Sequence, residues 1–418
     1  MKEKLIFIVP SLLLCIVRKL WTLPLLESHR SFLFYRGHEK FECLVDEHKW
    51  ENDVANRKLV NEEDMDVFAR DGAILLRDVI SKDWLRVYRQ LLNHVFHNPN
   101  TWDMLYSRMV ANFYGAQKSI FLHQSGACGR YIGSNSPATR IASEFFRHQH
   151  QESPSKLVQL RIIEPTEALI NYGNGDGHTS WHRDDPYMHY KQGEHQNSEN
   201  LSDKNNTVVI RIWIPLMDMR LSQMKFLALN NSVTSMIERE KNGIAILGTN
   251  FSQFDDIASS NLTNGQIIGP GEKGYRAGDA FVFAGDTPHF AQGLNCSSVG
   301  CARLIFSFAL DGKAVYDSSK KTTLLPLYSG QENGKPLRGK QFPLIFPKAS
   351  LKNQDWEDAF DFVTYGDVFK SMWHAIEGGV SSFAGLNWKK ALPYFVNVRM
   401  AIQENVWVKP DIDLDSGK

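Results

Sequence analysis

Three side chains of this sequence could together hold a metal ion. His182 and Asp184 lie two positions apart in the segment 181–184 (WHRD), and His289 ends the later segment 285–289 (GDTPH). In an extended chain alternate side chains share a face, so His182 and Asp184 would point the same way. Two histidines and one carboxylate can occupy one face of an octahedral Fe(II) ion and leave the opposite positions open for a keto acid and O2. A zinc protease would need a helical HExxH motif, which the sequence does not contain.

Arg303 is the residue that we expect to anchor the keto acid. It lies in an apolar segment in which alternate residues share an inward face, and these are Arg303, Ile305, Ser307 and Ala309. The residues between them would face outward beneath covering helices, and these are Leu304, Phe306, Phe308 and Leu310. A buried arginine needs an anion, and its planar fork matches a carboxylate through two hydrogen bonds. Ser307 is a second candidate for this contact.

Other polar and aromatic residues of the strand-like segments could line the same site. Tyr172 ends the segment before the metal motif and could hydrogen-bond the keto acid, and Trp213 could lie beside that acid or fill the barrel. Arg161 and Arg211 could bind an anionic substrate, or could form ion pairs at strand edges. For the flanking residues His178, His189 and Asp185 we expect no role as ligands, because the three ligands above already complete a site.

The sequence resembles the phytanoyl-CoA dioxygenase-like family of Fe(II)/2-oxoglutarate oxygenases over residues 62–310. The matching segments are 68–77 (FARDGAILLR), 182–184 (HRD), 213–218 (WIPLMD) and 278–283 (GDAFVF), followed by His289, Asn295 and Arg303. The resemblance implies a double-stranded β-helix, Fe(II) and 2-oxoglutarate as cofactors, O2 as oxidant, and release of succinate and CO2. Residues 229–233 (LNNSV) stand where the family often has a PGSH-like segment, and residues 311–418 have no match, so both leave the substrate open.

The order of predicted elements is helices, then strands, then helices. Residues 65–72 predict a short helix ended by Gly72, Ser81 would cap the next helix, and residues 136–150 predict another. Strand patterns cover 73–79, 160–172, 207–217, 280–284 and 302–310. We expect a mainly β protein with flanking α, a double-stranded β-helix (jelly-roll or cupin-type) core with packed N- and C-terminal helices. The predicted parts are an apolar segment at 1–26, an extension at 27–61, the oxygenase domain at 62–310 and a helical extension at 311–418.

The composition and the N-terminal residues limit which partners and which cellular compartment are expected. Lysine plus arginine and aspartate plus glutamate both number 47 in the 418 residues, so no basic excess predicts a nucleic-acid partner. The five scattered cysteines favour free thiols over a disulfide framework. The apolar residues 5–26 would allow association with a membrane or entry to the secretory pathway, or form a helix packed on the domain. A cytoplasmic location therefore stays open as well.

The function predicted from these residues is oxidation of a C–H bond of a small-molecule substrate by a dioxygenase. One form is hydroxylation, desaturation or oxidative cyclisation of an amino-acid-like secondary metabolite, as in kainoid-forming members of this oxygenase group. The alternatives are a hydroxylase of a lipid or acyl substrate, a cupin-type enzyme with another metal, and a barrel that serves as a non-catalytic scaffold. Arg303 disfavours the cupin reading, and the complete ligand set disfavours the scaffold.

Overall fold

The computed structural model describes the sheet-rich middle of the chain. The described residues are 59–97, 116–119, 132–150, 158–162, 167–171, 179–184, 188, 190–192, 207–219, 225–227, 267–270, 274–291, 301–319, 331–339, 342 and 344–346. For the strand residues 116–119, 167–171 and 179–182, and for a few strand-end residues, the description covers the backbone alone.

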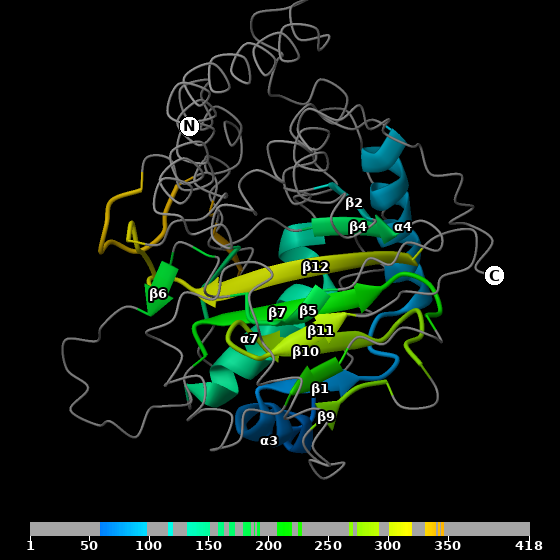
Figure 1. Cartoon of the computed structure of the whole chain (residues 1–418), viewed down its shortest axis with the longest axis horizontal. Helices are drawn as coiled ribbons and strands as arrows, with labels where there is room; N and C mark the ends of the chain where they lie inside the picture. Colours follow the sequence, from blue (N-terminus) through cyan, green and yellow to red (C-terminus); the bar gives the residue numbers. More distant parts are fainter. Residues whose placement is uncertain are drawn as a thin grey trace, which may run out of the picture.

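Two antiparallel sheets form the centre of the described part (Figure 1). The large sheet has the strand order β1 (Ala73–Leu76), β10 (Ala280–Ala284), β7 (Val209–Pro215), β12 (Cys301–Leu310), β3 (Leu160–Ile162) and β14 (Leu344–Phe346), while β4 (Glu167–Asn171) pairs with both β12 and β2 (Ala116–Ser119). The small sheet has the order β5 (Thr179–His182), β11 (His289–Ala291), β8 (Lys225–Leu227) and β9 (Ile267–Ile268). A separate pair joins β6 (Tyr190–Gln192) to β13 (Ala314–Tyr316).

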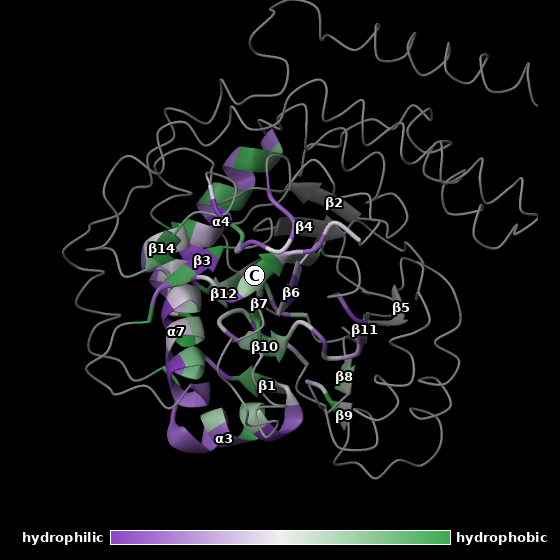
Figure 2. Ribbon diagram, turned by 90° about the vertical axis from the view of Figure 1, so that its left-hand side faces the viewer, coloured by the Kyte–Doolittle hydropathy of each residue, from purple (hydrophilic) through white to green (hydrophobic). Residues whose placement is uncertain are grey.

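The elements form three layers. Figure 2 shows the helices α3 (Glu62–Asp71), α4 (Lys82–His97) and α7 (Pro137–Gln149) on one side of the large sheet and the small sheet on the other side. We call the face of the large sheet toward the small sheet its inner face, and the opposite face its helix side. A strand covered on both faces should be buried along its length and mostly apolar. All residues of β7 and β10 are buried, which fits this central position.

Local signals in the sequence set the ends of the helices. Asn61 begins α3 with a capping box, because its side chain accepts a hydrogen bond from the Asp64 backbone and the Asp64 side chain accepts one from the Asn61 backbone. Gly72 ends that helix in the left-handed region at φ 71°, a conformation that costs glycine little. The Ser81 hydroxyl lies 3.4 Å from the backbone nitrogen of Trp84 at the start of α4. The helix ends predicted at Gly72 and Ser81 are confirmed.

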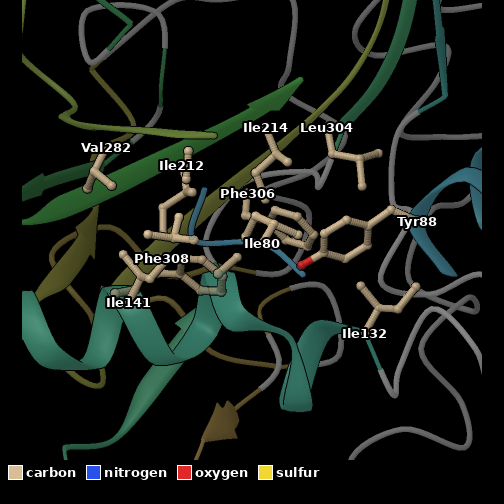
Figure 3. Close-up of a cluster of buried hydrophobic side chains, with 14 of the residues drawn as sticks. Ile80, Tyr88, Ile132, Ile141, Ile212, Ile214, Val282, Leu304, Phe306 and Phe308 are labelled. Carbon is tan, nitrogen blue, oxygen red and sulfur yellow. The ribbon is translucent and has the colours of Figure 1, made fainter. Parts of the chain in front are cut away.

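The helix side carries the main hydrophobic core (Figure 3). Alternate residues of the sheet strands meet side chains of the helices, and Figure 3 labels Ile212, Ile214, Val282, Leu304, Phe306 and Phe308 together with Tyr88 of α4 and Ile141 of α7. The Phe306 and Phe308 rings stack with centroids 5.9 Å apart. Each fully buried apolar side chain contributes about 1.5–3 kcal/mol relative to exposure, so this layer dominates the stability of the fold.

The inner face carries a second cluster that joins the two sheets. It contains Ala73, Trp213, Phe281 and Phe283 of the large sheet, Phe226 of β8, and Met219 and Tyr275. Phe226 and Phe281 stack with ring centroids 3.7 Å apart. Ile305 packs against this cluster, whereas Leu304, Phe306 and Phe308 lie in the helix-side core. The alternation predicted for residues 303–310 is therefore confirmed.

The mainly β architecture with flanking helices is confirmed for the described residues, while closure of the sheets into a double-stranded β-helix stays a prediction. The large sheet continues past the boundary predicted at residue 310, because β14 pairs with β3. The separate pair of β6 and β13 also includes residues past this boundary. The described residues between 311 and 346 thus form strands and turns where a helical extension was predicted. Residues 1–58 and 347–418 lie outside the described part. No helix within that part has the length and apolar character that a membrane crossing requires.

Candidate active site

Strand pairing in the small sheet brings the two predicted histidine ligands to one place in the backbone. His289 of β11 stands directly opposite His182 of β5 in the antiparallel register. The residue His289 is 5% exposed, and its ring packs between Phe226 and Phe283, with centroids 5.5 and 5.1 Å away. Since Phe283 belongs to the inner face of the large sheet, the His289 side chain points toward that face. The His182 side chain lies outside the described part.

The Asp184 carboxylate lies beside the His289 imidazole. Its Oδ2 is 3.6 Å from His289 Nε2, and the two side chains are 24% and 7% exposed. The other ring nitrogen of His289, Nδ1, lies 3.0 Å from the Thr287 backbone carbonyl. A carbonyl only accepts, so Nδ1 donates to Thr287, and Nε2 is the ring nitrogen that faces the carboxylate and would bind a metal. Metal-binding histidines are commonly held by such a carbonyl.

Among the side chains that the structure describes, no three histidine, cysteine, aspartate or glutamate residues gather within metal-binding range. Two of the three predicted ligands, Asp184 and His289, are in contact, and the third is represented by its backbone alone.

Arg211 of β7 reaches across from the large sheet to this carboxylate. The residue is 1% exposed, and its Nε lies 3.3 Å from Asp184 Oδ2. Its Nη2 donates a 2.9 Å hydrogen bond to the Tyr190 hydroxyl. The arginine predicted to bind substrate therefore contacts two residues of the protein, and one of these is a predicted metal ligand.

Three of the four residues predicted for the keto acid, Arg303, Ser307 and Trp213, share the inner face with Arg211. In the register of β7 and β12, Arg303 stands opposite Pro215, Ile305 opposite Trp213, and Ser307 opposite Arg211. Ser307 is 1% exposed and Arg303 is partly buried. Cross-strand neighbours and diagonal neighbours of a sheet lie within reach of long side chains. Arg303, Trp213 and Ser307 thus form one continuous strip beside the Asp184 contact.

The Trp213 indole is a buried donor for which the described residues supply no acceptor. The residue is fully buried, its ring packs edge-on against Tyr275 at 4.8 Å, and no described atom accepts a hydrogen bond from Nε1. Burial also raises the pKa of the Tyr275 hydroxyl, so that group stays protonated at neutral pH. An unpaired buried N–H costs about 1–3 kcal/mol, so a bound acceptor at this position would be favourable.

Arg161 lies on β3, which is separated from β7 by β12, and it is engaged by a carboxylate of the protein. It forms an ion pair with Asp311, which Arg338 also contacts, and its Nη1 donates a 2.7 Å hydrogen bond to the Phe342 carbonyl. Burial raises the pKa of the Asp311 carboxyl, but hydrogen bonds from Arg338 and Arg161 outweigh this effect and bring the pKa below its usual value. This is the arrangement expected for the ion-pair alternative.

Two contributions to the site had no signal in the sequence. Tyr190 follows the metal motif in a polar context, and only strand pairing brings its hydroxyl to Arg211. Phe226 belongs to the short strand β8, and its ring covers His289. Tyr172 and the flanking residues His178, His189 and Asp185 lie outside the described residues.

No protein-family model and no curated protein sequence matches the chain. Among solved structures it is similar to SnoN, a non-heme alpha ketoglutarate-dependent epimerase from nogalamycin biosynthesis, with 14% identity and a TM-score of 0.48 over 68% of this chain and 97% of SnoN. It is similar to SnoK, a carbocyclase of the same biosynthesis, with 15% identity and a TM-score of 0.47 over 70% and 98% of the two chains.

A third similar structure is EctD from S. alaskensis with 2-oxoglutarate and 5-hydroxyectoine, at 14% identity and a TM-score of 0.33 over 64% of this chain and 79% of EctD. These similarities are partial, since each TM-score is below 0.5. The resemblance to the phytanoyl-CoA dioxygenase-like family stays a prediction.

Proposed function

We propose that this chain is an Fe(II)- and 2-oxoglutarate-dependent oxygenase that oxidises a C–H bond of a small molecule and releases succinate and CO2. The observation that carries the proposal is the contact of Asp184 with His289, together with the backbone pairing of His289 with His182. These residues are far apart in the sequence and have the types that one octahedral Fe(II) ion needs.

The described donor atoms fit the metal. The Asp184 carboxylate and Nε2 of His289 lie 3.6 Å apart, and the Thr287 carbonyl accepts from Nδ1, so Nε2 is the ring nitrogen placed to bind a metal. His182 would complete the set from the opposing strand. Bound iron would supply O2 activation, and the buried aromatic residues Phe226 and Phe283 would keep water from the imidazole.

The inner face of β7 and β12 fits the co-substrate. Arg303 would bind a carboxylate of 2-oxoglutarate, with Ser307 as a second donor, and the unpaired Nε1 of Trp213 would donate to an oxygen of a bound acid. Tyr172 is proposed as a further contact on the sequence pattern alone.

The substrate is proposed as a small molecule, with two chemical classes to compare. An amino-acid-like metabolite would undergo hydroxylation or oxidative cyclisation, and a lipid or acyl substrate would undergo hydroxylation. The case for an anionic substrate rested on Arg161 and Arg211, and both have partners within the protein. We therefore give neither class priority.

The test begins with the purified wild-type chain under anaerobic conditions. Titration with Fe(II) and 2-oxoglutarate should give a stoichiometric complex with a visible charge-transfer absorption, and O2 should then convert the keto acid to succinate. Asp184→Ala and His289→Ala should each abolish both signals. A wild-type chain that binds neither the metal nor the keto acid would favour the non-catalytic scaffold.

Replacement of Arg303 tests the co-substrate anchor separately. Arg303→Ala should weaken 2-oxoglutarate binding by about 2–5 kcal/mol, the scale for stripping the partner from a buried charge, without loss of Fe(II) binding. The matched control is Arg89→Ala, because Arg89 donates to the Leu216 carbonyl and belongs to α4 on the helix side. An unchanged affinity for 2-oxoglutarate in Arg303→Ala would rule out this assignment.

A further inference from the structure

We propose that Arg211 is a positioning residue that holds the Asp184 carboxylate in place for the metal, and that Tyr190 in turn holds Arg211. The proposal rests on the proposed function, since it takes Asp184 as a metal ligand. It replaces the substrate-binding role that the sequence predicted for Arg211.

The first support is that one carboxylate oxygen serves both neighbours. Asp184 Oδ2 is the atom that lies 3.3 Å from Arg211 Nε and 3.6 Å from His289 Nε2. Asp184 lies two residues after the end of the short strand β5 of the small sheet, whereas Arg211 belongs to the central strand β7 of the large sheet. The ion pair therefore ties the loop that carries the carboxylate to the most buried part of the fold.

The second support is the burial of the guanidinium. The Arg211 side chain is 2% exposed, and a buried cation needs a partner charge and filled hydrogen-bond positions. Nε lies 3.3 Å from the carboxylate and Nη2 donates to the Tyr190 hydroxyl, so two nitrogens of one rigid planar group contact two separate segments. Rotation of the guanidinium away from Asp184 would break both contacts.

The third support is that Tyr190 is itself fixed. Tyr190 begins β6, where it stands opposite Tyr316 of β13, and its ring is 2% exposed. It packs in a cluster formed by Val209, Ala309, Ala314, Leu337 and Phe342. The hydroxyl that accepts from Arg211 thus belongs to a residue with little freedom to move, and the series Asp184, Arg211, Tyr190 connects the proposed metal site to a packed cluster at the ends of β7 and β12.

A positioning role and a substrate-binding role for Arg211 predict different results when the residue is replaced. Residues that orient metal ligands typically change metal affinity about 10- to 100-fold when they are replaced. A residue that only binds substrate would change the KM for substrate and would leave Fe(II) binding in the absence of substrate unaltered. Metal binding without substrate therefore separates the two roles.

The experiment measures anaerobic Fe(II) dissociation constants and the visible spectrum of the Co(II)-substituted protein, whose bands report the ligand geometry. Arg211→Met should weaken Fe(II) binding about 10- to 100-fold and shift the Co(II) bands. Arg211→Lys keeps the charge without the planar fork and should recover part of the affinity. Tyr190→Phe removes one hydroxyl, keeps the arginine and should give a smaller loss in the same direction.

The matched control is Arg77→Met. Arg77 pairs with the buried Asp279 at 2.7 Å, so this variant also removes an arginine from an arginine–aspartate pair, but the pair is remote from the proposed ligands. It should lose stability and keep the wild-type Fe(II) affinity and Co(II) spectrum. If Arg211→Met does not fold, Arg211→Lys and Tyr190→Phe carry the comparison.

Two outcomes would overturn the proposal in different ways. Folded Arg211 variants with wild-type Fe(II) affinity and an unshifted Co(II) spectrum would refute the positioning role and leave the proposed function standing. A wild-type chain that binds no Fe(II) would refute the proposed function and the positioning role together.

Discussion

Single side chains on the inner face have two different kinds of surroundings. Arg211 is held by Asp184 and Tyr190, and Arg161 is held by Asp311 and the Phe342 carbonyl. Trp213 is different, because its Nε1 is buried and no described atom accepts from it. A buried donor that lacks an acceptor lowers the stability of the empty protein and favours a ligand that brings one.

The variant Trp213→Phe removes this donor and so tests its effect on stability and on ligand affinity. We expect little change in the free energy of unfolding without ligands, because the lost ring volume is offset by removal of a donor whose unpaired burial costs about 1–3 kcal/mol. The affinity for 2-oxoglutarate should fall by about 0.5–1.5 kcal/mol, the net value of one hydrogen bond. Denaturant unfolding and keto-acid titration measure the two quantities. Trp84→Phe on the helix side is the control, and an unaltered affinity in Trp213→Phe would contradict the prediction.

At the scale of elements, some turns next to the strands need a positive φ, which glycine adopts with little strain. Gly278 precedes β10 at φ 102°, and its carbonyl accepts a 2.9 Å hydrogen bond from the Ile80 nitrogen. A Cβ at this position would lie 3.1 Å from the Ile80 carbonyl oxygen. Gly334 has φ 77°, but a Cβ there would meet nothing within 4 Å.

These two glycines form a matched pair for substitution. Gly334→Ala should cost about 1 kcal/mol, the penalty for the left-handed backbone alone. Gly278→Ala should cost more, in the range of about 1–3 kcal/mol, because backbone strain and the close approach to Ile80 act together. Urea unfolding of both variants gives the comparison. Equal losses would mean that the contact with Ile80 relaxes without cost.

A second element-scale prediction concerns the segment that follows β12. Asp311 at the end of this strand is contacted by Arg161 of β3 and by Arg338, and its pKa lies below the usual value. A folded pKa below the unfolded value of about 3.9 stabilises the protein at pH values above that value. This contribution is lost as the pH falls through the folded pKa.

Asp311→Asn should therefore lower stability at neutral pH and flatten the decline of stability in acid. The measurement is the free energy of unfolding in urea over a series from about pH 6 to pH 2, compared with wild type. The two curves should converge at the acid end, since a protonated Asp311 and an asparagine are both uncharged. Curves that stay parallel over the whole series would exclude a linked proton at Asp311.

At the scale of the whole molecule, one face of the large sheet packs the hydrophobic core and the other face carries the proposed ligand-binding residues. Leu304, Phe306 and Phe308 of β12 lie in the helix-side core, and Ser307 on the same strand lies opposite Arg211 on the inner face. Substitutions on the helix side should act on folding, and substitutions on the inner face should act on ligand binding.

Adjacent residues of β12 allow a direct test of this division. Phe308→Ala should lower the free energy of unfolding by about 3–5 kcal/mol, the usual cost for a buried phenylalanine, while the folded fraction keeps its affinity for 2-oxoglutarate. Ser307→Ala should change stability by much less and should weaken keto-acid binding. Thermal unfolding and keto-acid titration of both variants check the prediction. It fails if Phe308→Ala weakens keto-acid binding or if Ser307→Ala lowers stability as much as Phe308→Ala.

Features of the fold that depend on residues close together in the sequence could be predicted, whereas those that depend on distant residues could not. Gly72, Ser81 and the alternation of residues 303–310 are local signals, and the structure follows them. The partners of Arg161 and Arg211 were not predictable, because they depend on which strands pair. Arg338 and Phe342 come from a segment without apolar periodicity, and Tyr190 reaches Arg211 only through the fold of β6.

The position of β12 in the large sheet has a consequence for synthesis of the chain. This strand lies between β7 on one side and β3 and β4 on the other, although all three precede it in the sequence. During synthesis on the ribosome, the edges of those earlier strands that pair with β12 stay unpaired until residue 310 has left the exit tunnel. Closure over such separations is slow, and exposed strand edges invite association. A nascent chain stalled before β12 would therefore be a substrate for chaperones.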